Sequence, residues 1–391
     1  MIQSILDTDA YKLSMQQTVL HQFPGTMVRY SFKCRNKVKF SKECFDTIAN
    51  NVYYKLPALC LTTEELCYLK TIRFLKPDYL EYLEAFRFMP NRHVQITNDD
   101  EDLSISIKGP WLTTILYEIP ILAIVNEAYF ATGRPQNDYE HIAHTIEKNL
   151  SYKISLVQDL HDNNFKFADF GTRRRYSYQT QKFVLDRLQS QLPNNFVGTS
   201  NVHFSNLLGM HPIGTMAHEY IQCHQAMAYR LKDSQKAALE NWTKEYRGDL
   251  GIALTDTINS AAFLRDFDLY FAKLYDGCRH DSGDPYQWCA NLIDHYKKLN
   301  IDPMTKTAVF SDGLTIPKAI DIYKNFKDKI KMSFGIGTNL TNDVGLTPLQ
   351  IVIKVVECNG SPVAKISDDE GKQMCEDASY VAYLKKVFKI D

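Results

Sequence analysis

The sequence predicts an α/β protein in which an irregular TIM-like α/β barrel is joined to an α+β sandwich domain. Two observations lead to this prediction. Between residues 136 and 344, helical stretches alternate with short apolar runs, which is the pattern of parallel strands joined by crossover helices. Residues 1–135 and 345–391 instead carry alternating strands and hairpin signals, so we expect the two ends of the chain to share one α+β domain.

The N-terminal part supplies helices and antiparallel strands. Val28–Arg35 alternates apolar and polar side chains, as a half-buried strand does, and His93–Lys108 has the pattern of two strands around an acidic turn. The expected helices are Ala10–Gln22 with Asp7–Asp9 as its cap, segments within 41–90 that prolines interrupt, and Trp111–Thr132 with a kink near Pro120.

The barrel strands are expected at short apolar runs between longer helices. These runs are Phe165–Phe170, Asn195–Thr199, Gly251–Thr255, Phe271–Asp276, Thr307–Ser311 and Lys331–Gly335. Their number favours a closed or nearly closed barrel over an open sheet. Further on, Leu349–Glu357 and Pro362–Ser367 flank Asn359-Gly360, a strong hairpin signal. We expect this hairpin and the terminal helix to return to the first domain.

Charge and cysteine usage limit the classes of function. The 45 basic and 46 acidic residues give a formal net charge of −1, which argues against a nucleic-acid or anionic-membrane surface. The nine cysteines form no C-x-x-C pair or zinc-ligand spacing, so we expect reduced thiols in a cytoplasmic protein. The N-terminus lacks the basic and apolar regions of a signal peptide, and no apolar run approaches the ~20 residues of a membrane helix.

The segment His211–Gln225 leads from an X-Pro pair through a Gly-Thr turn into a helix. Thr215 is a natural N-cap, so we expect a helix that runs to about Leu231. His218 would then lie in the first turn, where the helix dipole disfavours the imidazolium and a neutral ring can attack a phosphoryl group. This segment alone leaves open whether His218 is catalytic or structural. His224 lies on the apolar stripe and is expected to be a core histidine.

Two late loops carry glycines directly after expected strands. They contain Asp312-Gly313 and Gly337-Thr338, and their backbone N–H groups can cradle a phosphate. Each motif alone is weak, because glycine-containing turns are common. Two adjacent late loops of this kind, however, match the phosphate site found in many α/β barrels.

Charged clusters follow other expected strands. Asp281 and Asp284 lie just after Arg279, and carboxylates in such a place can bind ribose hydroxyls, stabilise an oxocarbenium-like centre or hold Mg²⁺. The alternative is a solvated acidic turn. Arg173–Arg175 could likewise be a solvated face, but because the run directly follows an apolar strand, we expect at least one of its arginines to meet an anion.

Taken together, these segments form a specific set of motifs. The set comprises TDAYKLSMQQ (8–17), FGTRRR (170–175), GTSN (198–201), GTMAHE (214–219), LTDT (254–257), RHDSGDP (279–285), SDGL (311–314) and FGIGTNLTND (334–343). The set resembles the nicotinate phosphoribosyltransferase family, and the resemblance covers almost the whole chain. Members of that family join a barrel to a mixed α+β domain and usually pair as homodimers, so the resemblance implies both features here.

The resemblance also implies roles for single residues. His218 matches a histidine that ATP phosphorylates, and the catalytic set implied is His218, Glu219, Asp256 and Asp281. The residues implied in nicotinate binding are Tyr11, Phe170, Arg173, Ser200, Thr215 and Arg279, and those implied in phosphoribosyl pyrophosphate binding are Asp312, Gly313, Gly337 and Thr338. Ser200 stands where the related nicotinamide enzyme carries an aspartate, and the loss of that acid suits a carboxylate substrate that Arg279 would pair with.

The expected function is the formation of nicotinate mononucleotide and pyrophosphate from nicotinate and phosphoribosyl pyrophosphate, the first step of NAD salvage from nicotinate. ATP is expected as a co-substrate, with Mg²⁺ carried in by the substrates and no fixed metal site. Asp256 and Asp281 would steady the ribose and the developing positive charge, while the pyridine nitrogen itself is the nucleophile.

Four alternatives stay open at this point. Within the class they are nicotinamide transfer and quinolinate transfer, the latter of which would need a denser cationic pocket. From other classes come a phosphosugar aldolase or isomerase, which would need a Schiff-base lysine or a Glu/His base at a strand end, and a non-catalytic phosphosugar-binding barrel. So many polar clusters at successive strand ends argue against the non-catalytic barrel, because each cluster is costly for stability unless it is used.

Overall fold

The computed structural model describes residues 1–132, 138–228, 230–369 and 372–390. One of its two sheets is antiparallel. It contains β1 (Met27–Cys34), β2 (Val94–Asp99), β3 (Asp102–Pro110), β11 (Ile351–Cys358) and β12 (Ser361–Pro362). These strands lie in the order β12-β11-β1-β3-β2. The expected strand at Val28–Arg35 and the hairpin at His93–Lys108 are therefore confirmed. The second hairpin also forms around Asn359-Gly360, but its return strand is only Ser361–Pro362, so the strand expected over Pro362–Ser367 is wrong for most of its length.

The second sheet is parallel. It contains β4 (Phe167–Asp169), β5 (Phe196–Thr199), β7 (Ile252–Leu254), β8 (Gly277–His280), β9 (Thr307–Phe310) and β10 (Lys331–Ile336). Their order is β5-β4-β10-β9-β8-β7, and every neighbouring pair is parallel. A parallel sheet beside an antiparallel one confirms the predicted α/β fold class.

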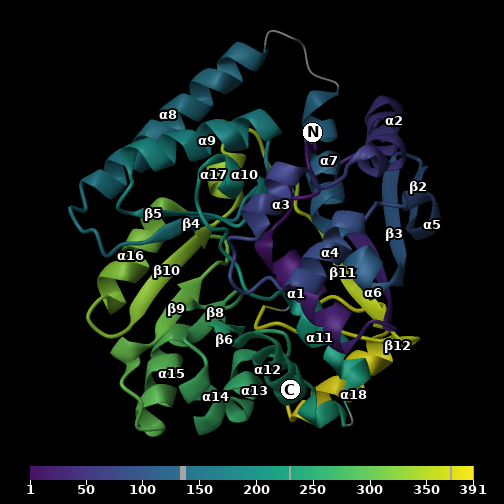
Figure 1. Cartoon of the computed structure of the whole chain (residues 1–391). Helices are drawn as coiled ribbons and strands as arrows, with labels where there is room; N and C mark the ends of the chain where they lie inside the picture. Colours follow the sequence, from purple (N-terminus) through teal and green to yellow (C-terminus); the bar gives the residue numbers. More distant parts are fainter. Residues whose placement is uncertain (133–137, 229, 370–371, 391) are drawn as a thin grey trace.

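Helices surround and connect the two sheets (Figure 1). Those of the N-terminal part are α1 (Ala10–Gln22), α2 (Lys42–Asn50), α3 (Thr63–Leu69), α4 (Pro77–Ala85), α5 (Pro90–His93), α6 (Trp111–Thr114) and α7 (Glu118–Ala131). The remaining ones are α8 (Asp138–Gln158), α9 (Tyr178–Gln191), α10 (Val202–Leu207), α11 (His218–Met227), α12 (Ser234–Tyr246), α13 (Ser260–Asp266), α14 (Leu269–Leu274), α15 (Pro285–Lys298), α16 (Ile316–Phe326), α17 (Thr338–Thr341) and α18 (Ala378–Phe388). Short 3₁₀ or π turns cover Asn51–Lys55, Leu56–Ala58, Ile115–Tyr117, Thr172–Arg174, Leu231–Asp233 and Pro303–Thr305, and β6 is Arg247–Leu250.

The two ends of the chain meet in the antiparallel sheet. β1 pairs with β11 along most of its length, with Val28 opposite Cys358 and Cys34 opposite Ile351. In Figure 1 the yellow C-terminal strands accordingly lie beside the blue N-terminal ones, and α1 and α11 lie between this sheet and the parallel strands. The exact domain boundaries that we expect, 1–135 with 345–391 and 136–344, stay a prediction.

The parallel sheet differs from a regular closed barrel. Among the described residues, no ladder joins its edge strands β5 and β7. The loop before α11 connects them instead, because Ile213 N–H donates to Thr199 O at 3.0 Å and Thr215 Oγ1 donates to Ile252 O at 2.9 Å. This loop contacts both edge strands and leads into α11, while a closed barrel stays a prediction.

One expected strand is wrong. Phe271–Asp276 lies mostly in α14, and the strand, β8, follows it. The reason is a cap: Asp268 Oδ1 accepts hydrogen bonds from the backbone N–H groups of Tyr270 and Phe271 and so starts a helix. A short apolar run fits a strand and a buried helix equally well, which is why its pattern was misleading.

The apolar stretch near residue 120 also differs from its prediction. It is broken into α6, the turn Ile115–Tyr117 and α7, so that the interruption lies before Pro120. By length and composition alone, Trp111–Ala131 is long and apolar enough to cross a membrane, which corrects the expectation that no apolar run approaches that length. Most of this stretch is buried inside the protein, as expected of a core helix.

Candidate active site

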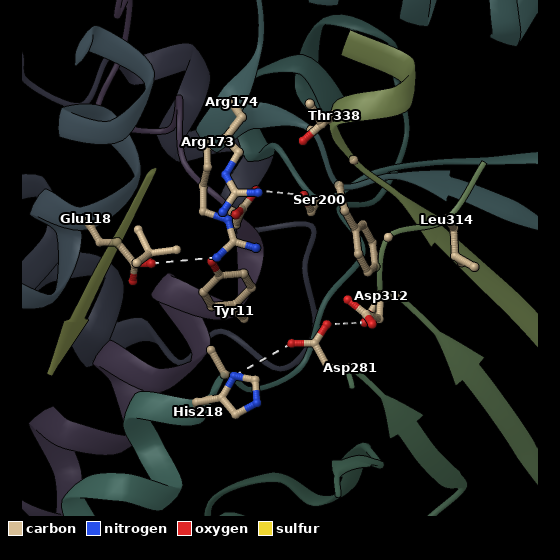
Figure 2. Close-up of a pocket in the computed structure, with 18 of the residues that line it drawn as sticks. Tyr11, Glu118, Arg173, Arg174, Ser200, His218, Asp281, Asp312, Leu314 and Thr338 are labelled. Atoms are coloured by element: carbon tan, nitrogen blue, oxygen red, sulfur yellow. Dashed lines mark hydrogen bonds and ion pairs between the residues drawn. The ribbon is translucent and has the colours of Figure 1, made fainter. Parts of the chain in front are cut away.

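A cavity of about 560 Å³ lies at the C-terminal ends of the parallel strands (Figure 2). The loops after β4, β5, β8, β9 and β10 line it, together with residues of α1, α11 and β11. Ligands bind at this end of the strands in α/β folds generally. The cavity therefore gathers residues that lie far apart in the sequence.

The helix that carries His218 starts later than expected. His218 is the first residue of α11 and Ala217 precedes it without a side-chain cap. Thr215 is not the N-cap, because its hydroxyl donates to Ile252 O instead. The helix also ends at Met227 rather than near Leu231. His218 still lies in the first turn, as predicted.

Both ring nitrogens of His218 face carboxylates. Nε2 lies 2.8 Å from Asp256 Oδ1, and Nδ1 lies 3.8 Å from Asp281 Oδ2 on the cavity side (Figure 2). Burial, helped by the positive charge of Lys365, lowers the pKa of His218 to about 4. The imidazole is therefore neutral at pH 7, although burial rather than the helix dipole is the main cause.

Asp256 lies behind His218 and does not line the cavity. Its Oδ1 faces His218, and its Oδ2 accepts from Ser282 Oγ at 2.6 Å and pairs with Lys365 Nζ at 2.7 Å. His218 and Lys365 outweigh the cost of burial and hold the pKa of Asp256 well below its ordinary value. Both oxygens of this buried carboxylate are thus bound, and one of them contacts the ring of His218. The catalytic role that we expect for Asp256 at the ribose stays a prediction.

His224 is a core histidine, as predicted. Its Nδ1 lies 2.8 Å from Tyr220 O, and its Nε2 lies 3.2 Å from Asn241 Nδ2. It does not line the cavity, and burial lowers its pKa to about 4.

Aromatic and cationic side chains meet at one end of the cavity. Tyr11 of α1, Phe170 after β4 and Arg173 all line it, as predicted. Arg173 Nη1 lies 3.7 Å from Glu118 Oε1, and this pair lies next to Tyr11 in Figure 2. Thr215, the other residue expected here, does not line the cavity, because its hydroxyl binds backbone.

Ser200 lines the cavity, but an acid lies beside it. Its hydroxyl donates to Asp9 Oδ1 at 2.7 Å, and Ala10 N–H donates to Ser200 O at 2.7 Å. Burial raises the pKa of the Asp9 carboxyl. The loop itself has Ser200 and no acid, as stated, but Asp9 of the N-terminal segment brings a carboxyl group next to it.

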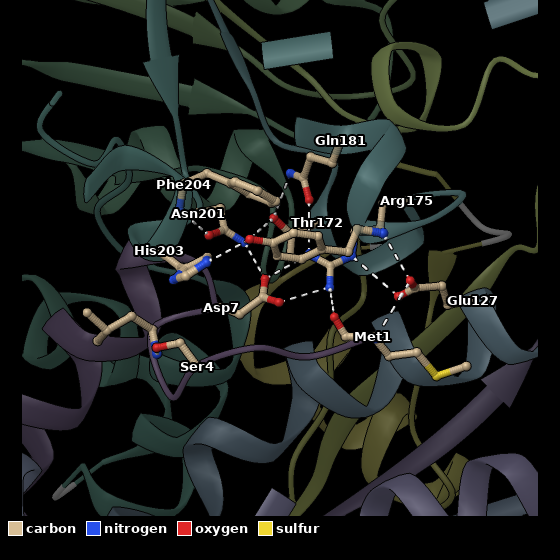
Figure 3. Close-up of polar contacts among 12 residues, drawn as sticks. Met1, Ser4, Asp7, Glu127, Thr172, Arg175, Gln181, Asn201, His203 and Phe204 are labelled. Atoms are coloured by element: carbon tan, nitrogen blue, oxygen red, sulfur yellow. Dashed lines mark hydrogen bonds and ion pairs between the residues drawn. The ribbon is translucent and has the colours of Figure 1, made fainter. Parts of the chain in front are cut away.

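The three consecutive arginines separate. Arg173 and Arg174 line the cavity, so the expectation that at least one faces the site is met. Arg175 is buried in the interior (Figure 3), where its Nη1 and Nη2 donate to the two oxygens of Asp7 at 2.7 and 2.9 Å. We expected Asp7–Asp9 to cap α1, but the side chains of Asp7 and Asp9 make no cap hydrogen bond. They bind Arg175 and Ser200 instead.

The loop after β8 brings Arg279 and Asp281 into the cavity. Arg279 Nε is buried and has no hydrogen-bond partner among the residues that the structure describes. Asp281, with 29% of its side chain exposed, accepts from Ser311 Oγ at 2.8 Å. The site therefore holds an arginine with an unpaired Nε and a partly open carboxylate close to His218, and the charge of Arg279 helps to lower the pKa of Asp281 against the cost of burial.

The two glycine loops line the cavity with Asp312, Gly313, Gly337 and Thr338, all as predicted. Gly313 has a φ of +53° and nothing within 4 Å of a built Cβ, so its backbone is open to a ligand. At Gly337 a Cβ would lie 3.0 Å from Phe170 O, which shows that this glycine also serves close packing. Asp312 Oδ1 pairs with Lys372 Nζ at 2.5 Å.

Glu219 lines the cavity but is occupied. It pairs with Lys12 and accepts hydrogen bonds from Tyr30 Oη and Trp111 Nε1. Both carboxylate oxygens of Glu219 are therefore already bound, and its expected place in the catalytic set stays a prediction.

Four cavity-lining cations were missed from the sequence: Arg35, Lys354, Lys365 and Lys372. They come from the strand region near residue 35 and from the C-terminal segment, where no motif surrounds them. Burial lowers the pKa of Lys354 to about 8. Only the pairing of β1 with β11 brings these residues to the site, so no local signal could have found them.

The chain is similar to known proteins over its whole length. The pattern described as "Nicotinate phosphoribosyltransferase (NAPRTase) family" matches residues 165–391, and that of the NAPRTase N-terminal domain matches residues 6–126. A nicotinate phosphoribosyltransferase of Cupriavidus necator is 49% identical and one of Bordetella pertussis is 50% identical; both alignments cover 100% of this chain, and 98% and 95% of the relatives. The crystal structure of the Vibrio cholerae nicotinate phosphoribosyltransferase superposes with a TM-score of 0.95 at 40% identity, covering 100% of this chain and 94% of that one. That of Porphyromonas gingivalis gives 0.92 at 35% identity, with 100% of both chains covered.

Proposed function

The chain belongs to the nicotinate phosphoribosyltransferase family, and from this premise we propose that its transfer reaction is coupled to ATP hydrolysis through a phosphohistidine at His218. Nicotinate and phosphoribosyl pyrophosphate are the substrates, and nicotinate mononucleotide and pyrophosphate are the products. The reaction would be the first step of NAD salvage from nicotinate. We also propose that the protein forms a homodimer and is cytoplasmic. The nine cysteines of the chain, all free, support the cytoplasmic location.

The observation that carries the ATP coupling is the setting of His218. A neutral imidazole whose Nε2–H donates to Asp256 has its Nδ1 lone pair free, and Nδ1 is the nitrogen on the cavity side. Nδ1 would attack the γ-phosphorus of ATP, forming an N–P bond as the bond to ADP breaks. The imidazolium charge that develops would be stabilised by Asp256, which stays ionised.

Glycosyl transfer itself needs little from the protein. The pyridine nitrogen of nicotinate attacks the ribose C1 while the bond from C1 to pyrophosphate breaks, so no general base is required. Positive charge develops on the ribose and then on the pyridinium nitrogen. Asp281, the partly open carboxylate beside His218, is placed to stabilise that charge.

Two arginines are candidates for the nicotinate carboxylate. Arg279 has the stronger claim, because its Nε lacks a partner while Arg173 already lies near Glu118. The rings of Tyr11 and Phe170 supply the apolar surface for the pyridine.

The phosphate groups would meet the two glycine loops and the uncompensated cations. Burial lowers the pKa of Arg174 to about 10, and the positive charges of Arg173 and Arg35 contribute to this shift. Several positive charges therefore lie close together at this place. Such a cluster suits the pyrophosphate of the ribosyl donor or the phosphate chain of ATP.

Mg²⁺ fits this site only in part. Three ligand atoms of His218, Asp256 and Asp281 lie within 4.8 Å of one another, but Asp256 is already occupied by His218, Ser282 and Lys365. Asp281, the partly open carboxylate, would therefore hold a metal ion that arrives on a diphosphate, rather than form a closed metal site with Asp256, and Asp312 would join it only by giving up its pair with Lys372. Such an ion would neutralise phosphate charge.

The test is to incubate the protein with labelled phosphoribosyl pyrophosphate and each of nicotinate, nicotinamide and quinolinate, with and without ATP. We expect product from nicotinate, and faster formation with ATP. The same incubations test the alternatives. Faster product formation from nicotinamide or quinolinate would assign that pyridine as the substrate instead. Binding of phosphoribosyl pyrophosphate without product from any pyridine would indicate a non-catalytic binding protein.

A further inference from the structure

A buried ion-pair triad lies beside the cavity and is not used by the reaction as described above. Lys12 Nζ lies 2.6 Å from Glu118 Oε2 and also pairs with Glu219 Oε2. The three side chains are 0%, 7% and 5% exposed. They come from α1, α7 and α11, and two of them directly follow residues of the site, Tyr11 and His218.

The Glu118 end of the triad reaches the pyridine end of the cavity. While its Oε2 pairs with Lys12, Glu118 Oε1 lies 3.7 Å from Arg173 Nη1, and Lys354 also faces it. Figure 2 shows the side chains of Glu118 and Arg173 converging above Tyr11. Glu118 is thus shared between a fully buried lysine and an arginine that is 38% exposed to the cavity.

The Glu219 end reaches the phosphoryl-acceptor histidine. Glu219 Oε1 accepts from Trp111 Nε1 at 3.0 Å and from Tyr30 Oη at 3.2 Å, while its Oε2 pairs with Lys12. Since Glu219 is the second residue of α11, these contacts fix the helix turn in which His218 faces Asp256.

Stability alone does not account for such a triad. A buried ion pair repays its desolvation only partly, and apolar side chains of similar volume often stabilise a protein as well or better. Removing Lys12 alone would leave two buried carboxylates close together, so one of them would bind a proton. The titratable and charged groups that face the pair on the Glu118 side are Lys354 of β11, Arg173, Asp9 and Tyr11 of α1. On the Glu219 side they are Tyr30 of β1 and Cys223 of α11.

We propose that Lys12 is a positioning residue that links the two ends of the site. By pairing with Glu118 and Glu219 at once, it holds Arg173 at the pyridine end and the first turn of α11 at the His218 end. Nicotinate bound at the pyridine end, with its carboxylate on Arg279, brings its negative charge and its ring beside Arg173, which is drawn away from Glu118. Glu118 then turns more fully to Lys12 and loosens the Lys12–Glu219 pair. Occupancy of the pyridine pocket and reactivity of His218 thereby affect each other, as linkage requires.

This inference rests on the proposed function, and its test separates the two. The rate at which γ-labelled ATP labels the protein is measured with and without nicotinate, in the wild type and in Lys12→Met. We expect nicotinate to change the wild-type rate by about fivefold or more, and the Lys12→Met rate by less than about twofold. In the ATP-free reaction, the KM for nicotinate of Lys12→Met should also acquire an ionisation between about pH 5 and 8 that the wild type lacks.

Matched variants isolate the role of Lys12. Lys12→Arg keeps the cation and should restore most of the nicotinate effect. Lys76→Met removes a lysine that pairs with Glu245 at 2.7 Å, away from the cavity, and should behave as the wild type. If Lys12→Met does not fold, the pair Lys12→Met with Glu219→Gln removes the uncompensated charge and should show the same loss of response.

Each outcome decides one question. A nicotinate effect that persists in Lys12→Met, that is absent from the wild type, or that Lys76→Met also loses would overturn the inference. If ATP labels neither the wild type nor any variant, the phosphohistidine proposal fails. The pH dependence of the KM for nicotinate still tests Lys12 in that case: a profile that is the same in Lys12→Met and the wild type would refute the positioning role of Lys12.

Discussion

At the residue scale, the proposed phosphoryl transfer depends on His218, a histidine that burial keeps neutral between two carboxylates. His218 offers Nδ1 to the cavity only while Asp256 accepts a hydrogen bond from Nε2. The sequence indicates His218, because a histidine beside a glycine turn at a helix start is a recognisable pattern. It could not indicate that Asp256 contacts the ring of His218, because that contact depends on burial and on Lys365, a residue outside every motif.

Replacement of Asp256 by Asn tests this assignment. An amide that donates to Nε2 would favour the tautomer with hydrogen on Nδ1, so the nitrogen facing the cavity would lose its lone pair. We expect the labelling rate with γ-labelled ATP to fall by about 100-fold or more, while circular dichroism remains that of a folded protein. Labelling at the wild-type rate would show that Asp256 does not set the tautomer.

The carboxylate partner of nicotinate can be identified by truncation. Arg279→Ala should weaken kcat/KM for nicotinate by about 2–4 kcal/mol, the scale for removing one partner of a buried charge pair. Use of nicotinamide, which lacks the carboxylate, should change much less. If Arg279→Ala leaves nicotinate use unchanged and Arg173→Ala reduces it, the roles of the two arginines are reversed.

At the element scale, local patterns predict helices and hairpins well but not every boundary. α1 spans the predicted Ala10–Gln22, and the hairpin strands lie where alternation and the Asn359-Gly360 turn place them. The stretch Phe271–Asp276 fails because a single capping residue, Asp268, turns a short apolar run into helix. The periodicity of the apolar residues does not show that Asp268 binds the backbone N–H groups of the next residues, so a prediction from periodicity alone gives a strand where the structure has a helix.

The loop after β10 leads to a revised prediction. A Cβ at Gly337 would meet Phe170 O at 3.0 Å, so a larger residue there would disturb packing as well as phosphate approach. We expect Gly337→Ala to lower the free energy of unfolding by about 1–2 kcal/mol and to raise the KM for phosphoribosyl pyrophosphate. Thermal unfolding and kinetics check the two effects, and an unchanged stability would show that the loop serves the phosphate alone.

At the scale of the whole molecule, the site joins distant parts of the chain. Its motifs were predicted from the sequence because each follows a strand of the parallel sheet. Arg35, Lys354 and Lys365 were not, because only the return of β11 to β1 brings them near. Asp9 beside Ser200 shows the same limit, since the N-terminal segment supplies a carboxyl group that the local loop sequence lacks.

Buried histidines should make stability depend on pH. His224 has a pKa of about 4 when folded and 6.5 as its ordinary value, so between these values the unfolded state binds more protons and stability falls as pH falls. The loss for His224 is at most about 3 kcal/mol. Asp169, whose pKa burial raises to about 6, works in the opposite direction. The test therefore compares the free energies of unfolding of the wild type and His224→Asn, measured with urea at pH 7 and at pH 5. We expect the substitution to cost less stability at pH 5 than at pH 7, and an equal cost at both would contradict this.

The central claim, that His218 carries a phosphoryl group from ATP, is tested most directly by labelling. γ-Labelled ATP with Mg²⁺ should label the wild type, and the label should be lost in acid and survive in base, as a phosphoramidate bond does and a phosphoserine bond does not. His218→Asn should abolish both the label and the ATP stimulation while leaving a slow ATP-independent transfer, and His224→Asn should still be labelled. A label that persists in His218→Asn but disappears in His224→Asn would contradict the account.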